Sequence, residues 1–134
     1  MIMPKQKLPV TVTAPVLHGR GLGHSLGAPT VNQLLPDHAR DLCYGVYFSR
    51  CTIGGKTYAS VTNVGVKPTV SQSGEPVAET HILDCDADLY GMEACTELLL
   101  FRREEKKFSS ETELARAIAE DVAAAKEYFK FKTV

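Results

Sequence analysis

Residues 45–63 read GVYFSRCTIGGKTYASVTN and contain two strand-like runs separated by a pair of glycines. The runs, residues 45–53 and 56–63, are rich in β-branched and aromatic residues, which are enriched in strands. Gly54 and Gly55 suit a two-residue hairpin turn, because such turns need backbone angles that glycine adopts without strain. The stretch therefore predicts an antiparallel hairpin in the middle of the chain.

Further strand-like runs lie on both sides of this hairpin. Residues 8–18, LPVTVTAPVLH, alternate at Val10 and Val12, and residues 77–84, VAETHILD, also have strand character. Residues 93–101 form a last strand that is strongly apolar toward its end, whereas residues 33–42 and 64–74 contain prolines and read as connections. Several short strands separated by turns predict a closed or nearly closed antiparallel barrel.

The end of the chain has a different pattern. Ser110 and Glu113 stand at capping-box spacing, which is typical of a helix start. Apolar residues then recur at helical spacing, namely Leu114, Ile118, Val122, Ala125 and Phe129. We expect an amphipathic helix over residues 110–129 that packs on the barrel.

Length, composition and charge limit the kinds of protein to which this chain can belong. A chain of 134 residues fits a single domain, 1–134, and 44% hydrophobic with 23% charged residues is ordinary for a globular protein. The net charge of -1 gives no broad electrostatic case for a nucleic acid or an anionic membrane. The four cysteines form no CxxC pair, and neither a signal peptide nor a membrane span is evident. These features predict a cytoplasmic monomer with free thiols.

Residues 19–32, GRGLGHSLGAPTVN, are rich in glycine and end in a proline-stiffened segment. Backbone N–H groups of such a loop can converge on a phosphate. Pro29 biases the residue before it toward an extended conformation, so Thr30 and Asn32 should point to the same side. Their neutral oxygens suit Mg²⁺ bound to nucleotide phosphates. The alternative is a mobile surface loop that ends at a strand.

Two further features carry possible chemistry. Glu79 lies in the middle of a strand, where a carboxylate is a poor β-former but would be held rigidly. There it could accept a proton from a hydroxyl that attacks a phosphoryl group, or it could be an ordinary exposed glutamate. Arg102 and Arg103 could bind phosphate or stack on an aromatic ring, or belong to a solvated charge run, FRREEKK.

The blocks GRGLGHSLGAPTVN, GVYF, TNVGVKPT, ETHILD, DLYG and FRREEKKFSS follow one another over residues 10–129. In this order and spacing the chain resembles the riboflavin kinase family. The resemblance implies a mainly β fold, a six-stranded antiparallel Greek-key barrel with a C-terminal α-helix packed on it. It also implies transfer of the γ-phosphate of ATP to the 5′-hydroxyl of riboflavin, which gives FMN.

The resemblance also implies roles for individual residues. Thr30 and Asn32 match the family positions that bind Mg²⁺ and the phosphates of ATP, and Glu79 matches the catalytic base. Two further groups match substrate-covering segments: Gly19, Arg20, Gly21 and Gly27 in the loop over the nucleotide, and Arg103 and Phe108 in the segment that closes over the flavin.

The chain departs from the family pattern at Ala28 and Val31, where the family usually has GFPTAN instead of GAPTVN. These changes put nucleotide affinity in doubt more than the type of reaction. The chain has no room for an N-terminal adenylyltransferase domain and lacks HxGH, so FAD synthesis is expected to be absent. Two other functions stay open. One is a non-catalytic flavin- or nucleotide-binding barrel module; the other is an oligonucleotide-binding barrel, which the near-neutral charge disfavours.

Overall fold

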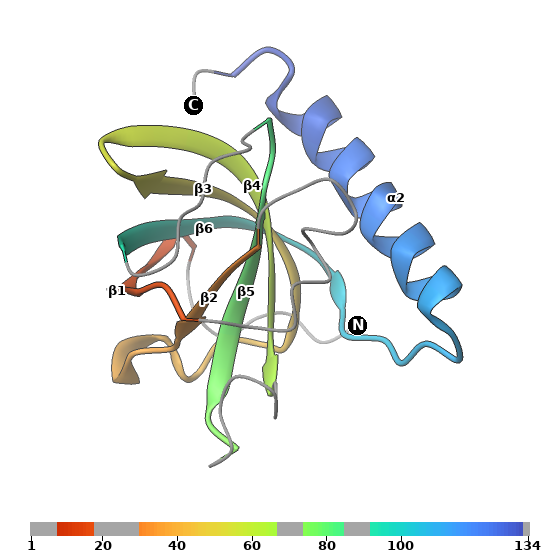
Figure 1. Ribbon diagram of the computed structural model, residues 1–134, viewed down its shortest axis with the longest axis horizontal. Helices are drawn as coiled ribbons and strands as arrows, with labels where there is room; N and C mark the ends of the chain where they lie inside the picture. The colour runs from red at the N-terminus through yellow and green to blue at the C-terminus, as the bar shows by residue number, and fades with distance from the viewer. Residues whose placement is uncertain (1–7, 18–29, 67–73, 85–91, 133–134) are drawn as a thin grey trace.

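A computed structural model describes residues 8–17, 30–66, 74–84 and 92–132. Its described part has six strands, one 3₁₀ turn and one α-helix (Figure 1). In chain order these elements are β1 (Val10–Pro15), β2 (Thr30–Leu34), η1 (Asp37–Ala39), β3 (Gly45–Ile53), β4 (Lys56–Val66), β5 (Pro76–Ile82), β6 (Glu93–Glu104) and α2 (Glu111–Phe129).

The strands form one antiparallel sheet in the order β1-β6-β3-β4-β5-β2, which curls strongly (Figure 1). Strands β3, β4 and β5 are sequential neighbours, and β2 lies beside β5 rather than beside β3, which is Greek-key order. Leu17, just beyond β1, forms a single bridge with Asn32 of β2, and its N–H donates to the Asn32 carbonyl at 2.7 Å. The predicted six-stranded Greek-key barrel with a C-terminal helix is confirmed.

The barrel interior combines an apolar core with a hydrogen-bonded set of polar side chains. The Gln33 amide of β2 donates to the carbonyls of Ala14 and Ala94 at 2.9 and 2.8 Å, and the Thr96 hydroxyl donates to its oxygen at 2.7 Å. Buried polar groups are tolerated when they are satisfied in this way. Gln33 thus links β2 to β1 and β6 across the seam of the barrel. Interior hydroxyls continue the set across β3, β4 and β5: Ser49, Ser60, Thr62 and Thr80.

The predicted hairpin is present between β3 and β4. Gly54 and Gly55 have φ values of 61° and 81°, the positive angles that a type I′ turn requires at both central positions. Pairing then runs without interruption from Ile53↔Lys56 to Gly45↔Val64. The glycine pair therefore fixes the register of the two central strands.

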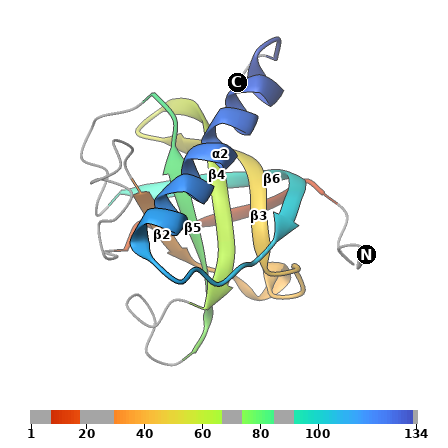
Figure 2. The same ribbon diagram turned by 90° about the vertical axis from the view of Figure 1, so that its right-hand side faces the viewer.

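Helix α2 covers one part of the outer face of the sheet and crosses it obliquely (Figure 2). Ala125 and Phe129 of the helix pack with Val46, Phe48 and Val61 of β3 and β4 in a second core outside the barrel. This confirms the predicted amphipathic helix. It also divides the outer face into a covered half and an open half.

The structure corrects several details of the sequence prediction. Residues 64–66 belong to β4 rather than to a connection. Gln33 and Leu34 belong to β2 rather than to a connection. Strand β6 continues through Glu104, so Arg102 and Arg103 lie in a strand and not in a solvated charge run. Ser110 caps the helix as predicted, but the Glu113 carboxylate accepts hydrogen bonds from the N–H and hydroxyl of Ser109, so the capping box is shifted by one residue.

Candidate active site on the outer face of the sheet

Polar residues of three adjacent strands form one row on the outer face of the barrel. Asn32 of β2 is the direct cross-strand partner of Glu79 of β5, and Glu79 is the partner of Asn63 of β4. Side chains alternate along a strand, so directly paired residues share a face. Thr30 is two residues from Asn32 and pairs with His81, so it faces outward too, as the sequence predicted. The topology therefore brings Thr30, Asn32 and Glu79 together.

Buried amide oxygens flank Glu79 on both sides. Asn32 is 1% exposed, and its Oδ1 atom has no hydrogen-bond donor among the described residues. The Oδ1 atom of Asn63 is buried and, in the same described part, also lacks a donor. An unsatisfied buried oxygen costs about 1–3 kcal/mol, so such atoms need an explanation. Both oxygens have the chemistry to accept a hydrogen bond or to bind a hard cation.

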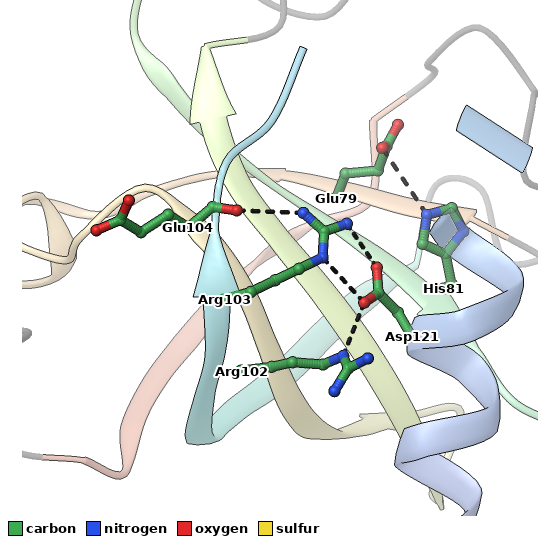
Figure 3. A network of polar contacts seen from close by, with 6 residues as sticks. All are labelled: Glu79, His81, Arg102, Arg103, Glu104 and Asp121. Atoms are coloured by element: carbon green, nitrogen blue, oxygen red, sulfur yellow. Dashed lines mark hydrogen bonds and ion pairs between the residues drawn. The ribbon is translucent and has the colours of Figure 1, made fainter. Parts of the chain in front are cut away.

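The carboxylate of Glu79 is held at the centre of this row. Its side chain is 24% exposed, and Oε1 lies 3.9 Å from Nε2 of His81, which is almost fully buried (Figure 3). Because residue 79 lies inside β5 and is paired on both sides, its backbone is fixed. A rigidly placed carboxylate that solvent can still reach is suited to accept a proton from a bound hydroxyl.

Arg103 lies at the end of β6 and its guanidinium faces the helix. Nη2 and Nε donate to the Asp121 carboxylate at 2.7 and 3.0 Å, and Nε of Arg102 donates to the same carboxylate at 2.8 Å (Figure 3). The Asp121 side chain is only 4% exposed. A Cβ atom at Gly45 would collide with the Arg103 carbonyl, so glycine there allows β3 and β6 to approach. Asp121 therefore fixes Arg103 between strand and helix.

The other predicted site residues are not all within the described part. Phe108 is half-buried in the segment between β6 and α2. Gly19, Arg20, Gly21 and Gly27 lie outside the described residues. Among the residues that are described, no group of three or more His, Cys, Asp or Glu side chains could hold a metal ion.

A pocket lies elsewhere on the outer face. Residues of β1, β3, β4 and β6 line a pocket of about 330 Å³, and none of them belongs to the Asn32–Glu79–Asn63 row. Across this pocket Arg50 and Glu97 form an ion pair at 3.7 Å. Its lining residues are Thr11, Arg50, Thr52, Thr57, Cys95 and Glu97.

Tyr47 and the described cysteines lie outside the row of polar residues. Burial raises the pKa of Tyr47, whose hydroxyl donates to the Cys43 carbonyl at 2.7 Å inside the core. Cys43, Cys51 and Cys95 are free thiols, as predicted. Over the described part of the chain, no helix has the length and apolar character to cross a membrane.

Sequence reasoning missed three residues of this region: Asn63, His81 and Asp121. A signal for Asp121 exists, since it stands seven residues after Leu114 and four before Ala125, on the apolar stripe of the helix. A carboxylate on a buried stripe needs a partner, and the arginine pair in β6 supplies it. His81 stands two residues after Glu79, so strand alternation alone puts both on one face, but its contact with Thr30 and the place of Asn63 could be found only from the strand register.

Comparison with protein-family models matches residues 6–129 to the model described as Flavokinase: Riboflavin kinase. The chain is 39% identical over 118 residues to a bifunctional riboflavin kinase/FMN adenylyltransferase of Pseudomonas fluorescens, covering 88% of this chain and 38% of that protein. It is 33% identical over 119 residues to an RNA-binding riboflavin kinase of Bacillus subtilis, covering 89% of this chain and 51% of that protein. The chain thus spans 38% and 51% of the length of these two relatives.

A solved structure shows the same fold. The crystal structure of riboflavin kinase from Trypanosoma brucei superimposes with a TM-score of 0.62, at 18% sequence identity, over 94% of this chain and 83% of that chain.

Proposed function

The chain belongs to the riboflavin kinase family, and on that premise we propose that it transfers the γ-phosphate of ATP to the 5′-hydroxyl of riboflavin and forms FMN. The observation that carries the proposal is the outer-face row in which Glu79 lies directly beside Asn32. Phosphoryl transfer needs mainly positioning and charge stabilisation, and this row offers a fixed carboxylate next to unsatisfied oxygens.

In the proposed reaction the Glu79 carboxylate accepts the proton of the riboflavin 5′-hydroxyl. The hydroxyl oxygen forms a bond to the γ-phosphorus while the bond to the β,γ-bridging oxygen breaks, so that FMN and ADP leave. A carboxylate on a paired strand needs no reorganisation to accept that proton, which favours catalysis. Glu79 is the catalytic residue of the proposal.

Thr30 and Asn32 are the residues that would hold Mg²⁺. The unsatisfied Asn32 oxygen fits this role, because an amide oxygen is a ligand that hard cations accept. When bound, the ion would neutralise charge on the phosphates of ATP. Thr30 and Asn32 contribute by presenting oxygens from a strand rather than from a flexible loop, with Glu79 as the neighbour of Asn32.

The remaining assignments extend the proposal to the substrates. Gly19, Arg20, Gly21 and Gly27 would cover the nucleotide, and Arg103 and Phe108 would lie against the flavin. Arg103 is already oriented by Asp121, so it could offer a pre-set guanidinium plane to the ring. The proposed substrates are small molecules; the cytoplasmic location, the monomeric state and the absence of a nucleic-acid partner stay predictions from composition.

Incubation of the chain with riboflavin, ATP and Mg²⁺ tests the proposal, with chromatography of the flavins and nucleotides. We expect FMN and ADP in equal amounts, and none when the metal is chelated. Riboflavin and ATP that bind in a calorimeter but yield no product would instead identify a non-catalytic binding module.

A further inference from the structure

His81 lies behind both Thr30 and Glu79 and contacts each of them. It is 5% exposed on the outer face of β5. Its Nδ1 atom is 3.4 Å from the Thr30 hydroxyl. Its Nε2 atom is 3.9 Å from Oε1 of Glu79, the contact that Figure 3 shows. Thr30 is its direct cross-strand partner, so the strand register holds the first contact in place. One buried ring thus touches the proposed cation ligand and the proposed base.

Only one neutral form of the ring suits both contacts. An imidazole with hydrogen on Nδ1 would direct the lone pair of Nε2 at the Glu79 carboxylate, which is repulsive. With hydrogen on Nε2, that N–H faces the carboxylate, and Nδ1 accepts the hydrogen of the Thr30 hydroxyl. Thr30 has a single hydroxyl hydrogen, so its lone pairs are then left for a ligand on the other side.

We propose that His81 is a positioning residue that orients the Thr30 hydroxyl toward the cation and holds the Glu79 carboxylate toward the substrate hydroxyl. This role rests on the proposed function. Catalytic contacts are often long in ligand-free proteins and shorten when substrate binds, so the 3.9 Å separation fits a contact that tightens in the complex. A residue that only fills space beside its other cross-strand partner, Val61, would not need two polar contacts.

The two contacts can be removed separately. His81→Gln places an amide near the Nε2 position and loses the Nδ1 acceptor, whereas His81→Asn keeps a polar atom near Nδ1 and does not reach Glu79. His81→Leu removes both at similar volume. We measure kcat and KM for MgATP in FMN formation, and the melting temperature of each variant.

The proposal predicts a split between the kinetic constants. His81→Gln should raise KM for MgATP about tenfold with kcat nearly kept, because one oriented hydrogen bond is worth about that factor. His81→Asn should lower kcat about tenfold with KM nearly kept, and His81→Leu should show both changes. In a double-mutant cycle, His81→Gln should add little to the KM of Thr30→Val, since the hydroxyl that it orients is gone.

Three outcomes would overturn the positioning role while leaving the proposed function intact. The first is a His81→Leu variant with the kcat and KM of an active wild type. The second is that the Gln and Asn variants lose activity equally and in proportion to their melting temperatures. The third is that the effects of His81→Gln and Thr30→Val on KM are additive. A wild-type chain that forms no FMN would overturn the proposed function first and the role of His81 with it. If His81→Leu does not fold, the Gln and Asn variants and the cycle still decide.

Discussion

Asn32 combines near-complete burial with a side-chain oxygen that no donor in the described part of the chain satisfies. Its neighbour in sequence, Gln33, has the opposite character, because its amide group makes three hydrogen bonds inside the barrel. Residues that lower stability without a local reason are concentrated at functional sites. The pair therefore contrasts a residue that we propose binds a ligand with one whose hydrogen bonds link strands of the fold.

This contrast gives the first prediction. Asn32→Ala should weaken MgADP binding about tenfold or more, because it removes a ligand oxygen. It should change the free energy of unfolding by less than about 1 kcal/mol, since relief of the unsatisfied oxygen offsets lost packing. Gln33→Ala, the matched control, should cost about 2–4 kcal/mol through orphaned interior partners. Calorimetry and urea unfolding measure both. Unchanged affinity in Asn32→Ala with a large loss of stability would make Asn32 a structural residue.

At this scale the sequence predicted some side-chain directions and missed others. The proline before Thr30 was enough to place Thr30 and Asn32 on one side, because strand alternation is local. The neighbours of Glu79 are set by the pairing of β5 with β2 and β4, and strand register is not visible in a single chain. Asn63 and the contact of His81 with Thr30 were missed for this reason, although alternation already places His81 on the face of Glu79.

The contact between β6 and α2 depends on one buried carboxylate. Asp121 is held by Arg102 and Arg103, and its side chain is 4% exposed. Removing one partner of such a group leaves the remaining charges uncompensated. Asp121→Asn should therefore lower the free energy of unfolding by about 2–4 kcal/mol. Glu120→Gln, an exposed neighbour on the same helix, should stay within about 0.5 kcal/mol.

Chemical denaturation of both variants checks this. Equal stability of Asp121→Asn and wild type would show that the ion pairs contribute nothing net, as happens for some buried pairs. A lowered melting temperature together with weaker flavin binding is expected if Asp121 also orients Arg103.

The start of α2 should give a measurable pH dependence. Hydrogen bonds from the hydroxyl and N–H of Ser109 lower the pKa of Glu113 from 4.5. A carboxylate whose pKa is lower in the folded state stabilises the fold above its unfolded pKa, and this contribution is lost as pH falls through the folded value. Wild type should therefore exceed Glu113→Gln in stability above about pH 5, and the difference should vanish at lower pH.

Unfolding measured between about pH 3 and pH 7 tests this, with Ser109→Ala expected to reduce the same pH-dependent part. A constant difference between wild type and Glu113→Gln across this range would show that the shifted cap does not stabilise the charged form.

The sequence predicted this helix well, because its apolar stripe and its cap are local signals. The role of Ser109 was missed, since two adjacent serines offer the same donors.

At the level of the whole barrel, the inner and outer faces have different roles. The interior is filled by apolar groups and satisfied polar groups, and α2 covers part of the outside. The sequence predicted the barrel from short strands and turns, but its six-strand count came only from the family resemblance. Closure through Leu17, Asn32 and Gln33 depends on contacts between distant strands, which no local pattern reveals.

We propose that the outer-face row beside Asn32, and not the pocket lined by Glu97, performs the reaction. Glu79 and Glu97 offer a matched pair, since both are partly exposed glutamates inside strands, each with a basic side chain nearby: His81 at 3.9 Å from Glu79 and Arg50 at 3.7 Å from Glu97. The decisive measurement is the single-turnover rate of FMN formation at saturating riboflavin and MgATP for wild type, Glu79→Gln and Glu97→Gln. We predict a loss of about 10²–10⁴-fold for Glu79→Gln, as expected for a general base, and no change for Glu97→Gln. A Glu79→Gln variant that folds and turns over at the wild-type rate would show that Glu79 is not the general base.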